Sequence, residues 1–155
     1  MVTSDVREAT LSDVAELIRL GEVMYTSMGV DCDDAWRQKA LAMLQARLGD
    51  DIVAFVVDDQ AGRLAACGAG TIAHRLPAPQ NPSGHAGYLQ WVATDPSCRR
   101  RGHARAVMDA LLAWYAERDV HVLELHATPD GEPLYRALGF HDRGPLALRR
   151  RSWEP

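Results

Sequence analysis

One stretch of this sequence governs how the rest is interpreted: Gln90-Trp91-Val92-Ala93-Thr94-Asp95-Pro96-Ser97-Cys98-Arg99-Arg100-Arg101-Gly102-His103-Ala104. A strand is expected to end near Thr94, and an amphipathic helix follows, because six residues recur on one helical face: Ala104, Val107, Met108, Leu111, Leu112 and Tyr115. The first turn of a helix presents unpaired N–H groups and the positive end of the macrodipole. The neighbouring arginines add charge, and Gly102 lets the backbone approach a ligand closely. The stretch predicts an anion site, and a pyrophosphate is its natural occupant.

A solvated basic helix start is the simpler interpretation of this stretch. Arginines at a helix N-terminus are unfavourable against the dipole, however, and an anion would offset them. The stretch is neither a Walker A loop, since no GKS or GKT follows, nor a dinucleotide fingerprint, since Gly102 is the only glycine in it. A phosphate-binding turn of another kind is therefore indicated.

The charge balance of the whole chain limits the classes of partner. The 155 residues carry 17 basic and 21 acidic side chains, a formal charge of −4, which argues against a nucleic-acid-binding protein. A composition that is 47% hydrophobic and 25% charged excludes a disordered chain.

Three cysteines show no CxxC spacing, and no metal site is expected. The sequence shows no signal peptide and no membrane-spanning run, so a cytoplasmic location is expected.

Hydrophobic periodicity divides the rest of the chain into alternating strands and helices. Thr10 and Asp13 form a capping-box variant that predicts a helix start, and a second helix is expected after Asp33 or Asp34. That second helix is expected to bury Trp36, Ala40, Met43 and Leu44. Strands are expected over Val2–Arg7, Ile52–Val57, Leu64–Ala73, His85–Thr94 and Val120–Thr128, with a short helix over Glu132–Leu138 and one or two strands between Phe140 and Arg151. Strict alternation along the third long strand places Gln90 and Trp91 on opposite faces.

The strand, Pro96, the Arg99-x-x-Gly102-x-Ala104 pattern and the helix together resemble the acetyl-CoA signature of the GNAT superfamily of N-acetyltransferases. A second motif, Leu134-Tyr135-Arg136-Ala137-Leu138-Gly139-Phe140, resembles the LYxxxGF sequence of that family. The lead-in from Leu125 to Gly131 is common in one bacterial branch. The resemblance covers essentially the whole chain. It implies a single α/β N-acetyltransferase domain over residues 1–155, with a mixed, largely antiparallel sheet of six to seven strands and about four helices.

The resemblance also implies an acetyl-CoA site, and it assigns residues to that site one by one. The backbone of Val92, Ala93 and Thr94 would pair with the pantetheine arm, while Thr128 matches a position that often contacts the cofactor. The pyrophosphate would be held by the helix start, namely Arg99, Arg100, Arg101, Gly102, His103, Ala104 and Arg105. No metal is implied.

Tyr135 matches the usual general acid of the family, and it also counts among the acetyl-CoA-binding residues. A phenol of reference pKa about 10 can protonate a departing thiolate of about 8.5; a core aromatic side chain is the simpler interpretation. Glu124 is the leading candidate for the general base. Glu124 and His126 share one strand face, and His85 is another candidate, but each could equally be an ordinary solvated residue.

The resemblance implies direct acyl transfer to a primary amine in a ternary complex, with a small and possibly cationic acceptor. The acidic stretch Asp31-Cys32-Asp33-Asp34 and Glu22 would suit a cation, although helix capping explains this stretch more simply. A non-catalytic CoA-binding or regulatory module of the same fold is the alternative function. A homodimer is expected from relatives, and neither a nucleic acid nor a membrane is expected as a partner.

Overall fold

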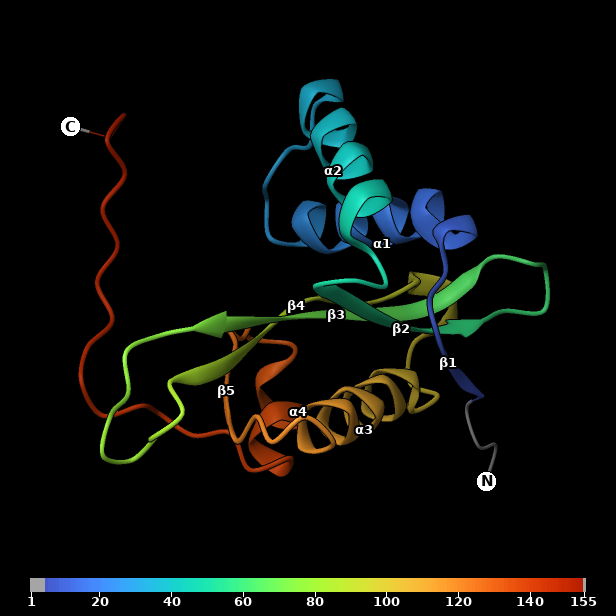
Figure 1. Ribbon diagram of the computed structural model, residues 1–155. Coiled ribbons are helices and arrows are strands. Elements are labelled where there is room, and N and C mark those ends of the chain that lie inside the picture. Colours follow the sequence, from blue (N-terminus) through green and yellow to red (C-terminus); the bar gives the residue numbers. More distant parts are fainter. Residues whose placement is uncertain (1–4, 155) are drawn as a thin grey trace.

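The computed structural model describes residues 5–154, and a central sheet organises them (Figure 1). Its strand order within this range is β1-β2-β3-β4-β5, with neighbouring strands antiparallel except for β5, which runs parallel to β4. The strands are β1 (Val6–Glu8), β2 (Ile52–Asp58), β3 (Leu64–His74), β4 (His85–Thr94) and β5 (Val122–Glu124). The predicted α/β class and the mixed, largely antiparallel sheet are confirmed, with five strands in place of six to seven.

Helices cover both faces of the sheet (Figure 1). One face carries α1 (Val14–Ser27) and α2 (Asp34–Arg47), and the other carries α3 (His103–Ala116) and α4 (Glu132–Ala137). Short 3-10 turns, η1 (Leu11–Asp13) and η2 (Pro96–Cys98), precede α1 and α3. The four α-helices of the described chain match the number expected.

The predicted capping residues start η1, which leads into α1, and α2. The Asp13 carboxylate accepts the backbone N–H of Thr10 at 2.8 Å, which is the reciprocal half of a capping box. The Asp33 carboxylate accepts the backbone N–H of Trp36 at 2.8 Å and caps α2.

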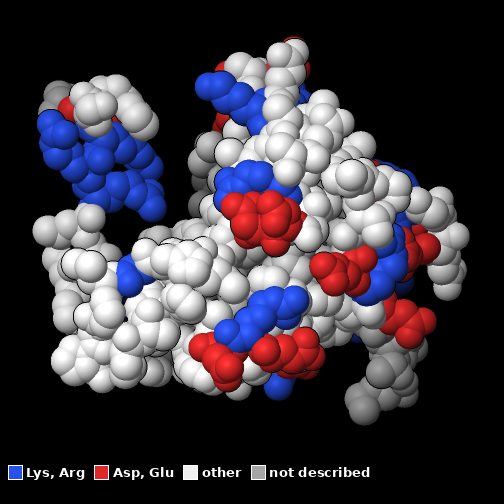
Figure 2. All heavy atoms as spheres, in the orientation of Figure 1, with Lys and Arg blue, Asp and Glu red and all other residues white. Residues whose placement is uncertain are grey.

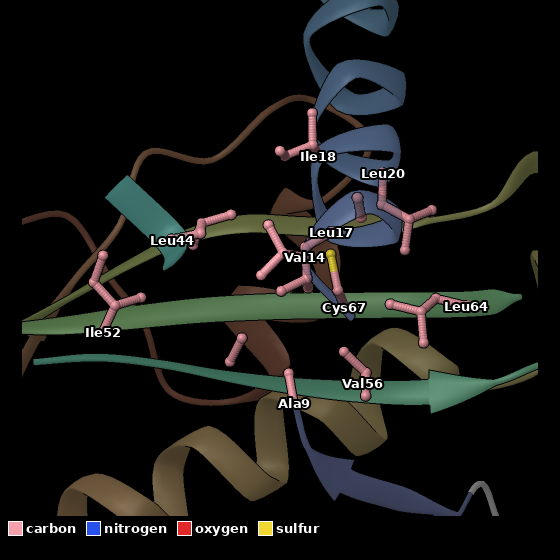
Figure 3. Close-up of a cluster of buried hydrophobic side chains, with 12 residues drawn as sticks. Ala9, Val14, Leu17, Ile18, Leu20, Leu44, Ile52, Val56, Leu64 and Cys67 are labelled. Carbon is pink, nitrogen blue, oxygen red and sulfur yellow. The ribbon is translucent and has the colours of Figure 1, made fainter. Parts of the chain in front are cut away.

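The sheet separates two hydrophobic clusters. The α1 side holds a cluster that includes Leu17, Leu20, Val56 and Cys67 (Figure 3). On the other side, Tyr115 of α3 is fully buried and its hydroxyl donates to the Thr71 carbonyl at 3.0 Å. Gly70 and Gly87 make room for that ring, because a Cβ at either position would clash with it. Close packing in both clusters fixes the sheet in place. The candidate site lies at the ends of its strands.

Three local expectations are corrected by the structure, and a fourth lies partly outside the described residues. The strand expected over Val120–Thr128 shortens to β5, because only Val122–Glu124 pairs with β4 before the two chains diverge. The strands expected between Phe140 and Arg151 are wrong, because these residues pair with no described strand of the sheet. Met43, expected to be buried on α2, is 52% exposed. The expected strand over Val2–Arg7 falls partly outside the described residues, and β1 begins at Val6.

Candidate acetyl-donor and acceptor site

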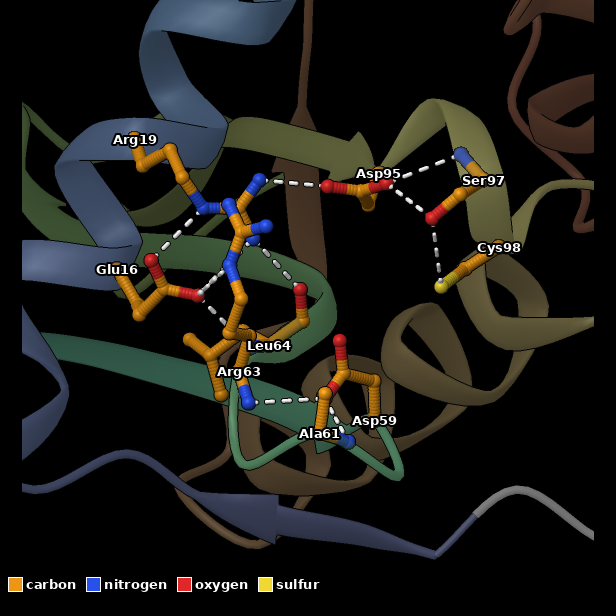
Figure 4. Close-up of polar contacts among 9 residues, drawn as sticks. All are labelled: Glu16, Arg19, Asp59, Ala61, Arg63, Leu64, Asp95, Ser97 and Cys98. Carbon is orange, nitrogen blue, oxygen red and sulfur yellow. Dashed lines mark hydrogen bonds and ion pairs between the residues drawn. The ribbon is translucent and has the colours of Figure 1, made fainter.

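The turn that joins β4 to α3 is held in place by Asp95. Its carboxylate accepts the backbone N–H of Ser97 at 2.9 Å, the Ser97 hydroxyl at 2.6 Å and the Arg19 guanidinium at 2.6 Å (Figure 4). These bonds, those from Ser97 first, lower the pKa of Asp95 to about 2. Arg19 also donates to Glu16 and to the Leu64 carbonyl, so α1, β3 and the turn form one polar network.

The start of α3 has the geometry of an anion site. Gly102 is the N-cap residue with φ of +79°, and a Cβ there would meet nothing within 4 Å, so the backbone faces open space. Arg99, Arg100 and Arg101 are exposed, and none has a carboxylate partner among residues 5–154. Arg101 and burial together lower the pKa of His103, with burial the larger cause. Unpaired cations beside free helical N–H groups are suited to a pyrophosphate.

A β-bulge in β4 shapes the adjoining strand. The pairing of β3 with β4 shifts register between Cys67 and Ala69, and Trp91 adopts φ of +53°, a strained conformation for a residue other than glycine. The Trp91 carbonyl accepts the Cys67 thiol at 3.2 Å. The expectation that Trp91 faces away from Gln90 is wrong, because the bulge turns the indole against Gly21 of α1.

Strand β4 offers a free backbone edge beyond the bulge. β5 pairs only with Ala86–Tyr88, so no described strand covers the outer edge of Val92–Thr94. An extended ligand could therefore hydrogen-bond to this edge as an added strand, and its anionic end would reach the start of α3. Val92, Ala93 and Thr94 thus end the strand that leads through η2 to the predicted residues from Arg99 to Arg105.

Tyr135 lies on α4 and lines a groove with residues 123–127 of β5 and the segment after it. Its ring packs near Gly131, where a Cβ would approach the Tyr135 Cε2 at 2.9 Å, and it lies 6.2 Å from the Phe140 ring. Burial raises the pKa of the Tyr135 phenol, so the hydroxyl keeps its proton at neutral pH. Thr128 helps to start α4, since its hydroxyl oxygen accepts the Gly131 N–H at 3.3 Å.

Glu124 lies on β5 opposite Tyr88 of β4. Arg75 donates two hydrogen bonds to its carboxylate, at 2.9 and 3.1 Å, and Arg143 lies 3.3 Å away. These guanidinium groups, Arg75 first, lower the pKa of Glu124. Glu124 is therefore ionised at neutral pH, and its basicity is reduced.

A polar pair beside Glu124 adds a residue that the sequence did not single out. The Tyr88 hydroxyl and His126 Nδ1 lie 2.6 Å apart, and burial raises the pKa of Tyr88. Tyr88 precedes Gln90 by two residues, so strand alternation could have placed it on the same face of the sheet. His85, the third candidate base, stacks edge-on against His74 at the far end of β4, with ring centroids 4.5 Å apart.

The structure thus brings the predicted residues together in two neighbouring groups. One comprises the β4 edge and the start of α3, and the other comprises Glu124, Thr128 and Tyr135 on β5, α4 and the loop between them. Such an arrangement can bind an extended anionic ligand beside a proton-bearing phenol.

The acetyltransferase (GNAT) family model matches residues 21–140, so the chain belongs to the GNAT acetyltransferase family. This membership supports acetyl-CoA as the co-substrate, and the residues at the start of α3 fit its anionic end. No curated relative matches the chain at a significant level.

Solved structures share the whole fold. A predicted acetyltransferase from Clostridium acetobutylicum, crystallised with acetyl-CoA, is 23% identical with a TM-score of 0.84, covering 95% of this chain and 96% of that one. A GCN5-related N-acetyltransferase from Ralstonia eutropha JMP134 is 26% identical with a TM-score of 0.81, covering 96% and 99%. Glucosamine-6-phosphate N-acetyltransferase from Arabidopsis thaliana is 18% identical with a TM-score of 0.68, covering 96% and 99%.

Proposed function

We propose that the protein transfers the acetyl group of acetyl-CoA to a primary amine of a small acceptor, by direct attack in a ternary complex. The observation that carries this proposal is the continuity of the site. A free strand edge over Val92–Thr94 leads into an open, cationic helix start at Gly102, and Tyr135 lines a groove together with Glu124. Family membership supports acyl transfer in general.

Acetyl-CoA would be bound by backbone groups of β4 along its pantetheine arm and by the start of α3 at its pyrophosphate. The pantetheine arm would pair with the outer edge of Val92–Thr94, and the pyrophosphate would accept N–H groups from the first turn of α3. Arg99, Arg100 and Arg101 would supply the compensating charge. The anchoring of this turn by Asp95 keeps these donors preorganised, which is the condition for stabilising charge without reorganisation.

Backbone groups of β4 and Tyr135 of α4 would assist the reaction itself. The deprotonated amine attacks the thioester carbonyl carbon, and the backbone N–H groups near the β4 bulge stabilise the oxyanion. The C–S bond then breaks, Tyr135 donates its phenolic proton to the departing thiolate, and the proton lost by the attacking nitrogen restores the phenol directly or through water. Burial of the phenol supports this role, since the proton is still present at neutral pH.

Glu124 is the proposed general base, acting on the ammonium form of the acceptor directly or through water. Its ion pairs with Arg75 and Arg143 reduce its basicity, and His126, two residues beyond the end of β5, is the second candidate. A pH–rate profile separates the two, because a carboxylate and an imidazole titrate in different ranges.

The acceptor is not required to be cationic, because three of the four carboxylates that suggested a cation already have partners within the protein. Asp33 caps α2, and both Asp34 and Glu22 bind Arg37. The acidic stretch therefore serves the packing of α1 against α2, and any small primary amine is a candidate.

A CoA-binding or regulatory module without catalysis is the alternative, and the retention of Tyr135 and Gly102 favours the enzyme. The test is thiol release from acetyl-CoA across a panel of amines, covering amino acids, polyamines, amino sugars and peptide N-termini. At least one amine should accelerate thiol release in proportion to enzyme concentration. Binding of acetyl-CoA with no acceleration by any amine would favour the module.

No helix among the described residues is long and apolar enough to cross a membrane. A cytoplasmic location and a bacterial origin both stay predictions.

A further inference from the structure

The bulge in β4 leaves two residues of this strand without a partner in the pairing with β3. Because the register shifts between Cys67 and Ala69, neither Trp91 nor Val92 has a residue of β3 opposite it. Trp91 also has a φ of +53°, which few residues other than glycine adopt. A strained conformation of this kind persists only where the surrounding structure determines it. The contacts of Trp91 therefore decide the shape of the bulge.

Helix α1 approaches the Trp91 side chain closely at Gly21. A Cβ at Gly21 would lie 3.0 Å from Cδ2 and Cε3 of the indole and 3.2 Å from its Cζ3, which is tighter than ordinary van der Waals contact. Gly21 is buried in the interior of α1, where glycine is less favourable than alanine for helix stability. The close approach of the indole explains this glycine, because a larger residue would push the ring away from the helix.

Helix α2 contacts the same indole through Trp36. The ring centroids of Trp36 and Trp91 lie 5.7 Å apart, and both side chains pack against the hydrophobic cluster on the α1 side of the sheet. The two helices thus hold the Trp91 ring and, through it, the backbone of the bulge.

The Cys67 thiol holds the bulge from β3. Its Sγ donates to the Trp91 carbonyl at 3.2 Å, and the backbone of Ala93 makes a hydrogen bond with the same sulfur. Cys67 is 1% exposed, and its sulfur lies on the α1 side of the sheet (Figure 3). Burial raises the pKa of Cys67 to about 12, so the thiol keeps the proton that it donates. One side chain therefore connects the two residues that flank Val92.

Uncharged groups make each of these contacts with the bulge. Many ion pairs of the protein lie at its surface instead, and Figure 2 shows acidic and basic side chains next to one another over the visible face of the body. Salt screens exposed charges, whereas apolar packing and a buried thiol hydrogen bond are screened much less. The conformation of the bulge should accordingly be insensitive to ionic strength.

We propose that Gly21 and Cys67 are positioning residues for acetyl transfer, which act through Trp91 by fixing the bulge of β4. This inference rests on the proposed function, in which backbone N–H groups near the bulge stabilise the oxyanion. Fixed donors stabilise a developing charge without reorganising, so a displaced bulge should slow the chemical step. The pyrophosphate site should be unaffected, because the turn before α3 is anchored separately by Asp95.

Gly21→Ala tests the contact from α1, since it adds one methyl group where the indole approaches. Alanine favours the helix, so a purely local effect would leave both stability and activity at least as high as in the wild type. Displacement of the indole should instead lower kcat for thiol release about tenfold and change the KM for acetyl-CoA by about twofold or less.

Trp91→Phe provides the second half of a double-mutant cycle, because phenylalanine lacks the outer ring of the indole that meets Gly21. Trp91→Phe alone should lower kcat. In that background, Gly21→Ala should cause little further loss, whereas two independent effects would multiply. Such non-additivity assigns the effect of Gly21 to its contact with Trp91.

Cys67→Ala removes the thiol donor, and Cys67→Ser keeps a donor in the same place. The alanine variant should lower kcat about tenfold, and the serine variant should restore most of this loss. Val57→Ala is the matched control, because Val57 is buried on β2 in the cluster on the other side of the sheet. Both alanine variants should be less stable to urea, but kcat should fall in Cys67→Ala alone.

Amide hydrogen exchange measures the bulge without any substrate. Exchange over residues 90–94 should be about tenfold faster in Gly21→Ala and in Cys67→Ala than in the wild type, while exchange over β2 stays unchanged. Added salt should not alter the wild-type rate over residues 90–94.

Three results would overturn the proposal. They are unchanged exchange over residues 90–94 in both variants, faster exchange with normal kcat, and an equal loss of kcat in Cys67→Ala and Cys67→Ser. A wild type that shows no turnover with any amine, while exchange responds as expected, would support the fixing of the bulge by Gly21 and Cys67 and would count against the proposed function alone.

Discussion

Two neighbouring regions of this molecule hold their residues by different means. The turn between β4 and α3 is fixed by polar contacts within one chain, with Asp95 at its centre. The region of β5, α4 and the exposed residues 144–154 has an open strand edge, a groove lined by Tyr135, and two exposed leucines, Leu146 and Leu148. The first region is thus fixed by contacts within the chain, whereas the second is open. Donor binding and chemistry should therefore respond differently to substitution.

The largest effect is expected in the second region, at Tyr135. Tyr135→Phe removes the phenolic proton while keeping the ring, so kcat should fall about 10²- to 10³-fold. The KM for acetyl-CoA should change little, because the pyrophosphate and pantetheine contacts lie elsewhere. Steady-state thiol release measures both constants.

Tyr25→Phe is the matched control, since it removes a hydroxyl from α1 to which no role is assigned. Equal turnover of Tyr135→Phe and the wild type would remove the acid from the mechanism. A selective rise in KM would make Tyr135 a binding residue only.

Glu124→Gln should lower kcat/KM about tenfold to a hundredfold. Its ion pairs lower the pKa of Glu124 below the ordinary value of 4.5, so the active carboxylate form is present above that pH and is lost below it. The acidic limb of the wild-type profile should accordingly lie below pH 4.5 and disappear in the variant. An acidic limb close to neutral pH, removed by His126→Ala, would transfer the role to that histidine.

Asp95→Asn addresses the stability of the first region. The pKa of Asp95 in the folded protein, about 2, lies below the ordinary value of 3.8. The ionised carboxylate therefore contributes fully to the free energy of unfolding above pH 4, and this contribution is lost as the pH falls through 2. The variant should lose about 2 kcal/mol at pH 7 in urea unfolding, and the difference should shrink toward pH 2.

Asp50→Asn is the control, because the exposed Asp50 carboxylate makes no hydrogen bond in the described structure. A difference between Asp95→Asn and the wild type that stays constant from pH 7 to pH 3 would mean that charge at Asp95 does not anchor the turn.

The smallest effect is expected at the arginines that surround Gly102. Arg101→Ala should raise the KM for acetyl-CoA about five- to tenfold and leave kcat unchanged, because one of several exposed cations is lost. Arg47→Ala on α2 removes an exposed arginine paired with Asp51 and should change neither constant. A fall in kcat without a change in KM would place Arg101 in the chemical step.

Local signals in the sequence predicted the helix start of the first region. The amphipathic period of α3 and the glycine at its start act over a few neighbouring residues, and both are present in the structure. The contact of Asp95 with Arg19 was missed, because it joins residues far apart in sequence. The β4 bulge was missed, because a register shift depends on the pairing with β3 and not on β4 alone. Its effect on Trp91 could not be derived from alternation.

The second region was predicted less well because its structure depends on distant partners. The apolar alternation from Val120 to Thr128 indicates a long strand, yet the strand ends at Glu124 where β4 diverges. The segment between Phe140 and Arg151 was predicted to contain one or two strands, but no described strand pairs with it. The contacts of Glu124 with Arg75 and Arg143 likewise join residues far apart in sequence.

Calorimetric titration of the protein with acetyl-CoA is the most direct test of the central claim, that the β4 edge and the start of α3 form a donor site. We expect saturable binding of one acetyl-CoA per chain, weakened by Arg101→Ala and unaffected by Tyr135→Phe. Absence of binding at millimolar acetyl-CoA, or equal binding by the wild type and Arg101→Ala, would contradict this assignment.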